Sequence, residues 1–507
     1  PSRGEEPHPA RRARAGFEER EAYSPQRRTA LVLAGTGTAG AYQAGVLRAF
    51  EEAGIRIDLV AGHGMGAASA LFAAIAGGNA LWKTGGIWTH PGRTKYRWRE
   101  PLRAAGFALS AAILVLLSPM ILVAGGAPVY LVAFAIGLMA PDAGRWIAAE
   151  YTALLGWLFQ PAVLPSLIPR ATVVALLFLV LAVGLSRLAT LWGARGDRRK
   201  HGPFWWLVGP PWASRAVIQY FTTNLWSLIR RTNALAQPTA VELSRRYAEL
   251  LTENLGQPGF REIVVTAHDI DARRDLVFAL LAEPYRQRFF ARSALQVAGQ
   301  RAAEAFDLSG ISRDHVVDAL EGALSLPVAT DPHFVTFAPE SYWRGETHRL
   351  CDRPGAMTRL LEEVAAAGAE QVIVVSPITE PSSPHELNVR REDPQGRAGE
   401  CLLAFGAATI RDAVVAWAGR FQGLYVIRPS HNPIGPFDAV GSYDDRSDRR
   451  HSIKELMACG YEDAYHQFIE PVVAASGEYL TQGVHDEPQY PIRRGHGADP
   501  SERRRSQ

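Results

Sequence analysis

Residues 31–76 read LVLAGTGTAGAYQAGVLRAFEEAGIRIDLVAGHGMGAASALFAAIA. The apolar run at 30–34 enters a loop with glycines at 35, 37 and 40, and residues 41–52 have the spacing of an amphipathic helix. A second apolar run, 57–61, then meets the turn Gly62-His63-Gly64-Met65-Gly66. This order predicts a strand, a glycine loop, a helix, a second strand, a sharp elbow and another helix.

The elbow pattern is typical of a nucleophile. Glycines two positions before and after the central residue permit a tight strand-to-helix turn, which lifts the central side chain to the start of the helix. The glycine loop would supply backbone N–H donors for an oxyanion. Here the central residue is Gly64, which has no side chain to react.

The stretch resembles the N-terminal half of a patatin-like phospholipase domain, with its GGGxRG loop and GxSxG elbow. The match is best at residues 40–55, GAYQAGVLRAFEEAGI. The resemblance implies a three-layer α/β/α domain and a serine–aspartate lipid acyl hydrolase. However, the elbow serine of the family falls at Gly64 and the loop arginine at Ala39.

The family's catalytic aspartate, in a DGG or DGA motif, is expected within Tyr342-Trp343-Arg344-Gly345-Glu346, where Arg344 stands in its place. Residues 319–327 and 367–377 resemble the segments that flank this motif. Glu346 and Asp352 lie nearby in the sequence, and either could replace the aspartate as a base. Without a hydroxyl at position 64, however, such a base has no nucleophile to deprotonate. The degenerate positions Gly64 and Arg344 therefore predict a pseudoenzyme with no catalytic residue.

The former active site could instead bind an anion. Arg344, the loop residues Gly35, Thr36 and Gly37, and the helix that begins at Met65 would together attract a phosphate or a carboxylate. The alternative is an ordinary surface ion pair of Arg344. For His63 and Ser69 we expect packing roles, and for Thr36 and Thr38 we expect turn chemistry.

A long apolar insertion follows the elbow. Residues 104–141 carry no charge, and 171–192 carry only Arg187, so two helices near 106–124 and 171–192 are expected to cross a membrane. Basic clusters on both sides place both ends on the cytoplasmic face. Four crossings are possible if 127–140 and 146–159 also cross, but Glu150 would be costly in lipid, and an interfacial or re-entrant course competes. Buried helices of a soluble domain are the remaining alternative.

The net charge of +3 is nearly balanced and gives no indication of nucleic-acid binding. The cysteines Cys351, Cys401 and Cys459 form neither a metal pattern nor a disulfide framework, so we expect no metal and no cofactor. The predicted organisation is a disordered basic tail (1–28), a first patatin-like part (29–92), the membrane insertion (93–200), a second patatin-like part (201–480) and a disordered tail (481–507).

Two functions remain open. In the first, the chain is a non-catalytic structural or lipid-binding subunit of the cytoplasmic membrane, whose partners are membrane lipids, other membrane subunits or a second copy. In the second, it is an active lipid acyl hydrolase with an atypical nucleophile. Glycine at position 64 favours the first.

Overall fold

The computed structural model describes residues 23–89, 96–163, 166–193, 210–230, 236–295, 303–339, 341, 343–378, 394–430, 442–443 and 450–473. The described chain forms two compact units, one made of Pro1–Arg97 with Ser214–Gln507 and the other of Trp98–Ala213. Residues 1–22 of the expected N-terminal tail (1–28), the expected C-terminal tail (481–507) and the basic cluster at 195–200 lie outside the described residues.

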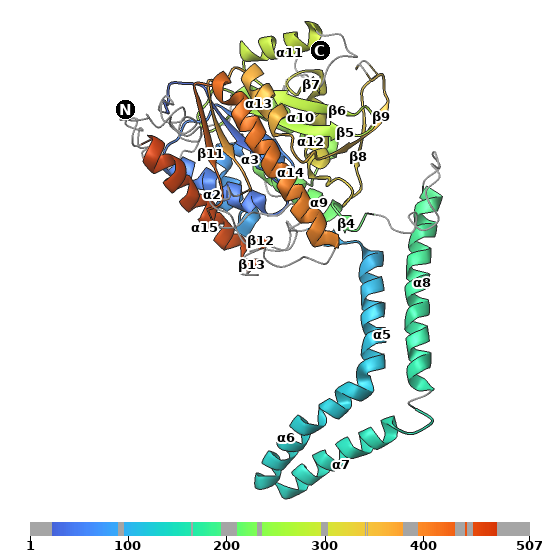
Figure 1. The fold of residues 1–507 in the computed structure, drawn as a ribbon. Helices are drawn as coiled ribbons and strands as arrows, with labels where there is room; N and C mark the ends of the chain where they lie inside the picture. Colours follow the sequence, from blue (N-terminus) through green and yellow to red (C-terminus); the bar gives the residue numbers. More distant parts are fainter. Residues whose placement is uncertain are drawn as a thin grey trace, which may run out of the picture. The chain divides into compact units, whose positions relative to one another are not determined.

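The first unit is built on a mixed sheet with mostly parallel pairing, which confirms the expected α/β class (Figure 1). Its strands follow the order β11-β10-β1-β2-β5-β6-β7, and β9 joins β5 while β8 pairs with β9. The strand bounds are β1 Thr29–Leu33, β2 Leu59–His63, β5 Glu262–Asp269, β6 Arg274–Leu280, β7 Ala303–Asp307, β8 His333–Thr336, β9 Thr347–Cys351, β10 Gln371–Val375 and β11 Gly423–Ile427. β1, β2 and β10 are buried throughout, as their continuous apolar runs predict for central parallel strands.

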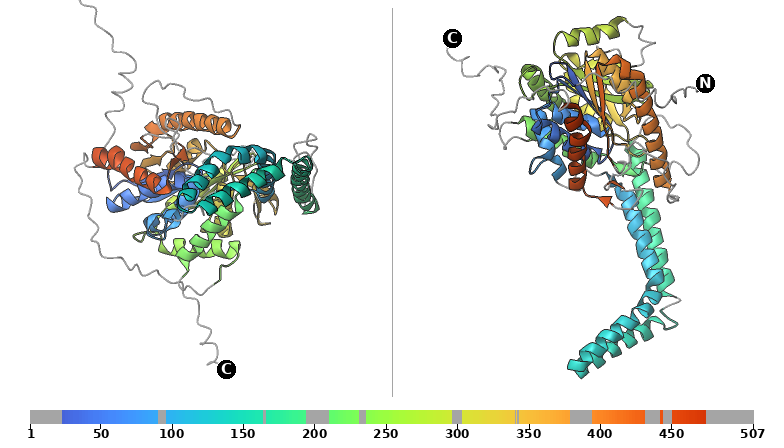
Figure 2. Two further views of the ribbon diagram at one scale, coloured as in Figure 1. Left: turned by 90° about the horizontal axis from the view of Figure 1, so that it is seen from below. Right: turned by 60° about the vertical axis from the view of Figure 1, so that its left-hand side comes forward.

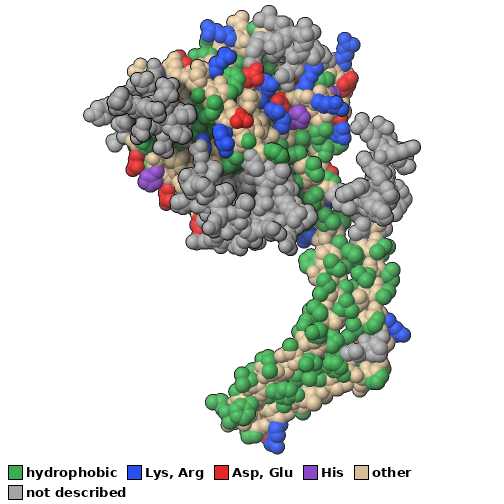
Figure 3. Space-filling model, viewed as in Figure 1, with side chains coloured by type: hydrophobic (Ala, Val, Ile, Leu, Met, Phe, Trp, Pro, Cys, Tyr) green, Lys and Arg blue, Asp and Glu red, His purple; other side chains and the backbone are tan. Residues whose placement is uncertain are grey.

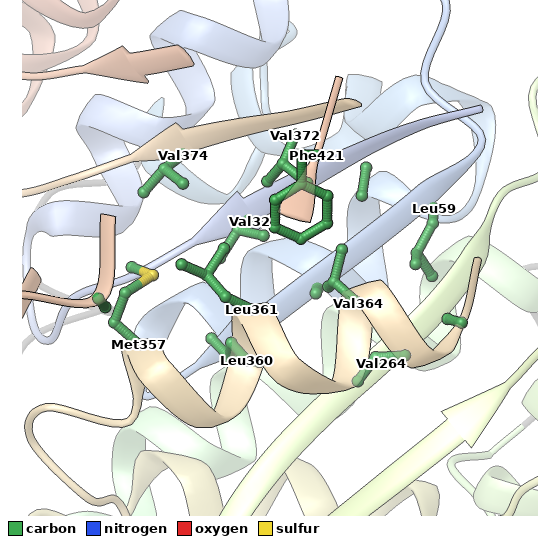
Figure 4. Close-up of a cluster of buried hydrophobic side chains, with 14 of the residues drawn as sticks. Val32, Leu59, Val264, Met357, Leu360, Leu361, Val364, Val372, Val374 and Phe421 are labelled. Carbon is green, nitrogen blue, oxygen red and sulfur yellow. The ribbon is translucent and has the colours of Figure 1, made fainter. Parts of the chain in front are cut away.

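Helices cover both faces of this sheet. One face packs on α13 (Met357–Ala366) and α14 (Pro394–Trp417), and Figure 4 shows Leu360, Leu361 and Val364 of α13 lying against Val32 and Val264 of the strands. The other face carries α2 (Ala39–Glu52), α3 (Met65–Ala73), α12 (Val316–Leu324) and α15 (Ile453–Ala464). The sheet therefore forms the middle of three layers.

Two helical regions of this unit are not single regular helices. Residues 225–255 form two helices, α9 (Arg215–Ile229) and α10 (Ala240–Asn254), because Pro238 disfavours helix at the preceding residue and Thr239 caps α10 by accepting the Glu242 N–H. The last helix changes at Tyr465 into a π-helical stretch, Tyr465–Val473, which contains Pro471. Elsewhere α11 covers Tyr285–Leu295.

The chain from Tyr23 to Arg28 is packed, so the N-terminal tail ends before residue 28. Tyr23 is 1% exposed, and its ring lies 5.5 Å from the ring of Phe468. The Arg28 guanidinium forms two hydrogen bonds with the Glu262 carboxylate, at 2.9 and 2.7 Å. Burial of an aromatic ring and a paired charge anchors this segment to the domain.

The second unit, Trp98–Ala213, is helical. It contains α5 (Glu100–Ala124), α6 (Gly126–Met139), α7 (Pro141–Leu158) and α8 (Leu167–Gly193). Its two ends meet where the Arg99 N–H donates to the Pro211 carbonyl at 3.0 Å and the rings of Trp98 and Trp212 lie 6.3 Å apart. Among the described helices, α5 alone is long and apolar enough to cross a membrane by length and composition.

A half-buried histidine network joins α12 to β8. His333 donates through Nε2 to Asp318 at 2.8 Å and through Nδ1 to Glu321 at 3.0 Å. Burial opposes its charge, but these two carboxylates raise the pKa of His333 to about 9 and the histidines lower the pKa of Asp318. His333 is therefore an imidazolium at neutral pH.

We expect this network to make stability depend on pH. Because the folded pKa of His333 lies above its unfolded value of about 6.5, its contribution is complete below pH 6.5 and is lost as pH rises through about 9, by on the order of 3 kcal/mol. Denaturant midpoints from pH 6 to 9.5 should fall in the natural protein and fall less in His333→Gln. The control is His466→Gln, since His466 forms an exposed pair with Glu470. Equal pH profiles for the natural protein and His333→Gln would contradict this assignment.

Candidate functional site

The predicted elbow is present between β2 and α3. Gly64 has φ 57° and ψ −132°, outside the regions that side chains favour, and it precedes the helix that begins at Met65. At Gly66 a Cβ would lie 2.0 Å from the Leu33 carbonyl oxygen, so β1 approaches the elbow more closely than any side chain would allow. Gly62, His63, Gly64, Met65 and Gly66 thus occupy the turn expected for a nucleophile, but no side chain rises from its centre.

The glycine loop lies beside this turn. Gly35 has φ 131° and Gly37 has φ 56°, and Thr36 lies buried between them. The Gly35 carbonyl accepts a hydrogen bond from the Met65 N–H at 2.8 Å. The residue after a nucleophile normally supplies an oxyanion donor, and here that N–H already has a protein acceptor.

A carboxylate does lie at the elbow, and it belongs to Asp352. This residue directly follows β9 and is 1% exposed, and its N–H donates to the Ser325 carbonyl at 2.7 Å. Its Oδ1 lies 3.2 Å from His63 Nδ1. Its Oδ2 has no hydrogen-bond partner among the described residues, and it would lie 2.8 Å from a Cβ placed on Gly64.

The expected position of Arg344 is corrected by this geometry. Arg344 is exposed in the turn between β8 and β9, with φ 48°, and its N–H donates to the Ser341 carbonyl. β9 separates Arg344 from Asp352, and its five residues span about 16 Å. Asp352, and not Arg344, faces Gly64. The anion site that combines Arg344 with Gly35, Thr36 and Gly37 is therefore not assembled.

The hydroxyls near the elbow do not replace the missing nucleophile. Ser69 is buried in α3, five residues beyond Gly64, and its Oγ has no hydrogen-bond partner in the described chain. Thr38 Oγ1 is likewise buried without a partner there. A serine acts as nucleophile when a base reaches its hydroxyl, and none of the hydrogen bonds described joins either hydroxyl to His63 or Asp352.

Nearby acidic groups are also held neutral. Burial, with the charges of Asp352 and Asp269, raises the pKa of the Cys351 thiol to about 12. Burial raises the pKa of Tyr96, which donates to the Leu324 carbonyl at 2.7 Å. Neither a thiolate nor a phenolate is therefore present at neutral pH. Within the described ranges, no group of three or more His, Cys, Asp or Glu side chains could hold a metal ion.

Comparison with known proteins gives little further information. No family model and no curated protein matches the chain. Among solved structures, VipD from Legionella pneumophila matches with 11% sequence identity and a TM-score of 0.27, covering 89% of this chain and 67% of VipD. A similarity this weak carries no argument about function.

Proposed function

We propose that the chain is a membrane-anchored pseudoenzyme of patatin-like descent, whose α/β domain serves as a non-catalytic structural or lipid-binding module. One observation carries this proposal. The space in which a nucleophile would stand at Gly64 is filled by the Asp352 carboxylate and the Gly35 carbonyl, which would lie 2.8 and 2.6 Å from an added Cβ. Both distances are far inside van der Waals contact.

Two steps of acyl transfer lack their groups in this arrangement. No hydroxyl at position 64 can form an acyl-enzyme, and the Met65 N–H donates to Gly35 instead of facing an oxyanion. Loss of the nucleophile in a serine hydrolase lowers turnover on the order of a million-fold. The loss of catalysis would leave the buried elbow as a structural element.

Membrane anchoring rests on the helical unit. α5 has a mean hydropathy of 2.5 over its most apolar window, and only 6% of that window is buried. Exposed apolar helices in water would be an aggregation hazard, whereas a bilayer covers them. Membrane lipids are therefore the first partners we expect, and other membrane subunits or a second copy are the next.

The buried His63–Asp352 pair supports a second possible function. A histidine and a carboxylate at 3.2 Å could act as a general base toward water, without a protein nucleophile. The chain would then be a lipid acyl hydrolase with an atypical mechanism. The two functions differ in whether turnover depends on this pair.

The test is hydrolysis of p-nitrophenyl esters and of phospholipid by the purified, detergent-solubilised protein. We expect no turnover above buffer and no labelling by a fluorophosphonate, with an active serine lipid hydrolase in the same detergent as the positive control. His63→Gln and Asp352→Asn should leave this baseline unchanged. Turnover by the natural protein that either substitution abolishes would overturn the proposal in favour of the second function.

A further inference from the structure

α5 and α6 form one bent helix. Gly125 between them is helical, with φ −67° and ψ −10°, and hydrogen bonds run through it from Gly125 N–H to the Ile121 carbonyl and from Val129 N–H to the Gly125 carbonyl. Residues 100–139 therefore rise about 60 Å along the helix, against about 30 Å for the apolar core of a bilayer. The whole length cannot stand upright in one membrane.

The helices pair in two halves. α5 packs along α8, which we call the proximal pair, and α6 packs along α7, which we call the distal pair (Figure 2). The hydroxyl of Tyr151 on α7 donates to the Leu122 carbonyl of α5 at the bend. In a bundle of four spans, each helix would pack along its whole length against the helices next to it in sequence. Here α5 packs on α8 and α6 packs on α7, so the four helices form one bent hairpin.

The described side chains of the proximal pair at 104–124 and 171–181 are uncharged and mostly apolar. Residues 104–124 carry no charge and rise about 31 Å, which matches the bilayer core. The exposed apolar side chains of these two helices include Phe107, Leu114, Met120, Val174, Leu177 and Val180. Figure 3 shows hydrophobic side chains over the visible face of the hairpin, with charged ones at its bend and tip. Because this uncharged surface matches the bilayer core in length, it fits lipid better than a groove on a partner protein.

The distal pair, in contrast, has two unlike sides. On α7 the buried face includes Gly144, where a Cβ would lie 2.4 Å from the Ala133 carbonyl oxygen of α6. The outward side of α7 exposes Asp142, Arg145 and Glu150, whereas Thr152 turns toward α6 and its hydroxyl lies 2.8 Å from the Tyr130 hydroxyl.

The outer side of α6 has no such polar residues. It exposes Leu131, Phe134 and Leu138, and the helix carries no charge. Trp146 and Trp157 are exposed on the outward side of α7, beside Asp142 and Glu150 in helical projection. An apolar helix beside a helix that exposes both charged residues and tryptophans is typical of a structure that lies in the membrane interface.

We propose that the proximal pair crosses the bilayer and that the distal pair lies in the opposite interface, with α6 toward the acyl chains and α7 toward water. This deepens the proposed membrane anchoring and rests on it. Glu150 then faces water and has no need of a partner within lipid. The distal pair thus contacts the interface of the leaflet that lies across the membrane from the α/β domain. The two crossings of the proximal pair begin and end on the side of the α/β domain.

Three matched alanine-to-cysteine substitutions test the arrangement, in full-length protein whose native cysteines are replaced by alanine and which is reconstituted in phosphatidylcholine–phosphatidylglycerol vesicles. Ala111→Cys lies on the outer side of α5, Ala135→Cys on the outer side of α6 and Ala153→Cys on the outer side of α7, and all three alanines are exposed. A membrane-impermeant maleimide is added to one side or the other, with Ser227→Cys as the reporter of the α/β domain. Labelling after denaturation in SDS shows that each thiol is present.

We expect rapid labelling of Ala153→Cys from the side opposite to Ser227→Cys, and labelling of Ala111→Cys and Ala135→Cys at least ten-fold slower. Protection of all three positions would overturn the inference in favour of four crossings. Labelling of Ala135→Cys with protection of Ala111→Cys would mean that the distal pair extends into water. Labelling of all three would remove the membrane anchor itself, whereas the hydrolase assay tests the other half of the proposed function separately.

Discussion

The substitution Gly64→Ala should lower the free energy of unfolding by about 2–5 kcal/mol. The φ of 57° costs an alanine about 1–2 kcal/mol relative to glycine. The added methyl would also meet the Gly35 carbonyl oxygen at 2.6 Å and Asp352 Oδ2 at 2.8 Å, an overpacking that typically costs about 1–3 kcal/mol. Denaturant midpoints followed by near-UV circular dichroism, at a common slope, measure the sum.

Gly256→Ala is the matched control. Gly256 also has a positive φ, of 85°, but a Cβ there meets nothing within 4 Å. Gly256→Ala should therefore lower the free energy of unfolding only through backbone strain, by about 1–2 kcal/mol. The additional loss in Gly64→Ala reports the two close contacts of the new methyl together with the unfavourable ψ of −132° at Gly64. If Gly64→Ala costs no more than Gly256→Ala, the elbow has room for a side chain and the central argument for a pseudoenzyme fails.

A double-mutant cycle assigns part of that additional loss to Asp352. In an Asp352→Ala background one of the two close contacts of the new methyl is gone, so Gly64→Ala should cost less there, by on the order of 1 kcal/mol. Additive costs would mean that Asp352 moves aside freely. The Gly35 contact remains in both backgrounds and serves as an internal reference.

The elbow could be predicted from sequence because its geometry is local. Glycine spacing and two apolar runs specify a strand, a turn and a helix within residues 57–76, and β2 and α3 have these positions. The class of the fold followed in the same way, since runs such as 371–375 are apolar on both faces and indicate parallel strands.

The resemblance placed the expected carboxylate position at Arg344, whereas in the structure the carboxylate beside Gly64 is that of Asp352. In this chain Asp352 is followed by Arg353-Pro354-Gly355, whereas Arg344 is followed directly by Gly345, which resembles the family motif more closely. A positional signal was nevertheless available. Asp352 comes at the end of a strand, where functional side chains of α/β sheets gather, and Arg344 comes before that strand begins.

Contacts between distant segments could not be predicted from one sequence. His63 and Asp352 are 289 positions apart, and only the neighbouring placement of β2, β5 and β9 brings them to 3.2 Å. The same holds for the bend of the insertion. Composition revealed apolar runs, but the pairing of α5 with α8 and of α6 with α7 depends on packing at sites such as Gly144.

The ion pair between Arg28 and Glu262 fixes the start of the α/β domain. Arg28→Ala should destabilise the protein by about 3–5 kcal/mol, because it leaves the Glu262 carboxylate buried without its partner. The two side chains are 11% and 8% exposed, and the Arg28 guanidinium also stacks 3.6 Å from the ring centre of Tyr285. Arg48→Ala is the surface control, since its 2.8 Å pair with Glu52 is 51% and 40% exposed and should be worth less than about 1 kcal/mol.

The pH dependence of the loss identifies its cause. Burial already raises the pKa of Glu262, and Arg28 opposes that rise. Without the guanidinium the folded pKa rises further above the unfolded value, so the folded variant favours the protonated acid and its penalty shrinks as pH falls from 8 toward 5. Replacing the pair in Arg28→Met/Glu262→Leu should recover most of the stability at pH 8, because no buried charge remains. A penalty that is the same at pH 5 and pH 8 would assign the loss to the Tyr285 contact, and the charge pair would then not be what fixes the first strand to the sheet.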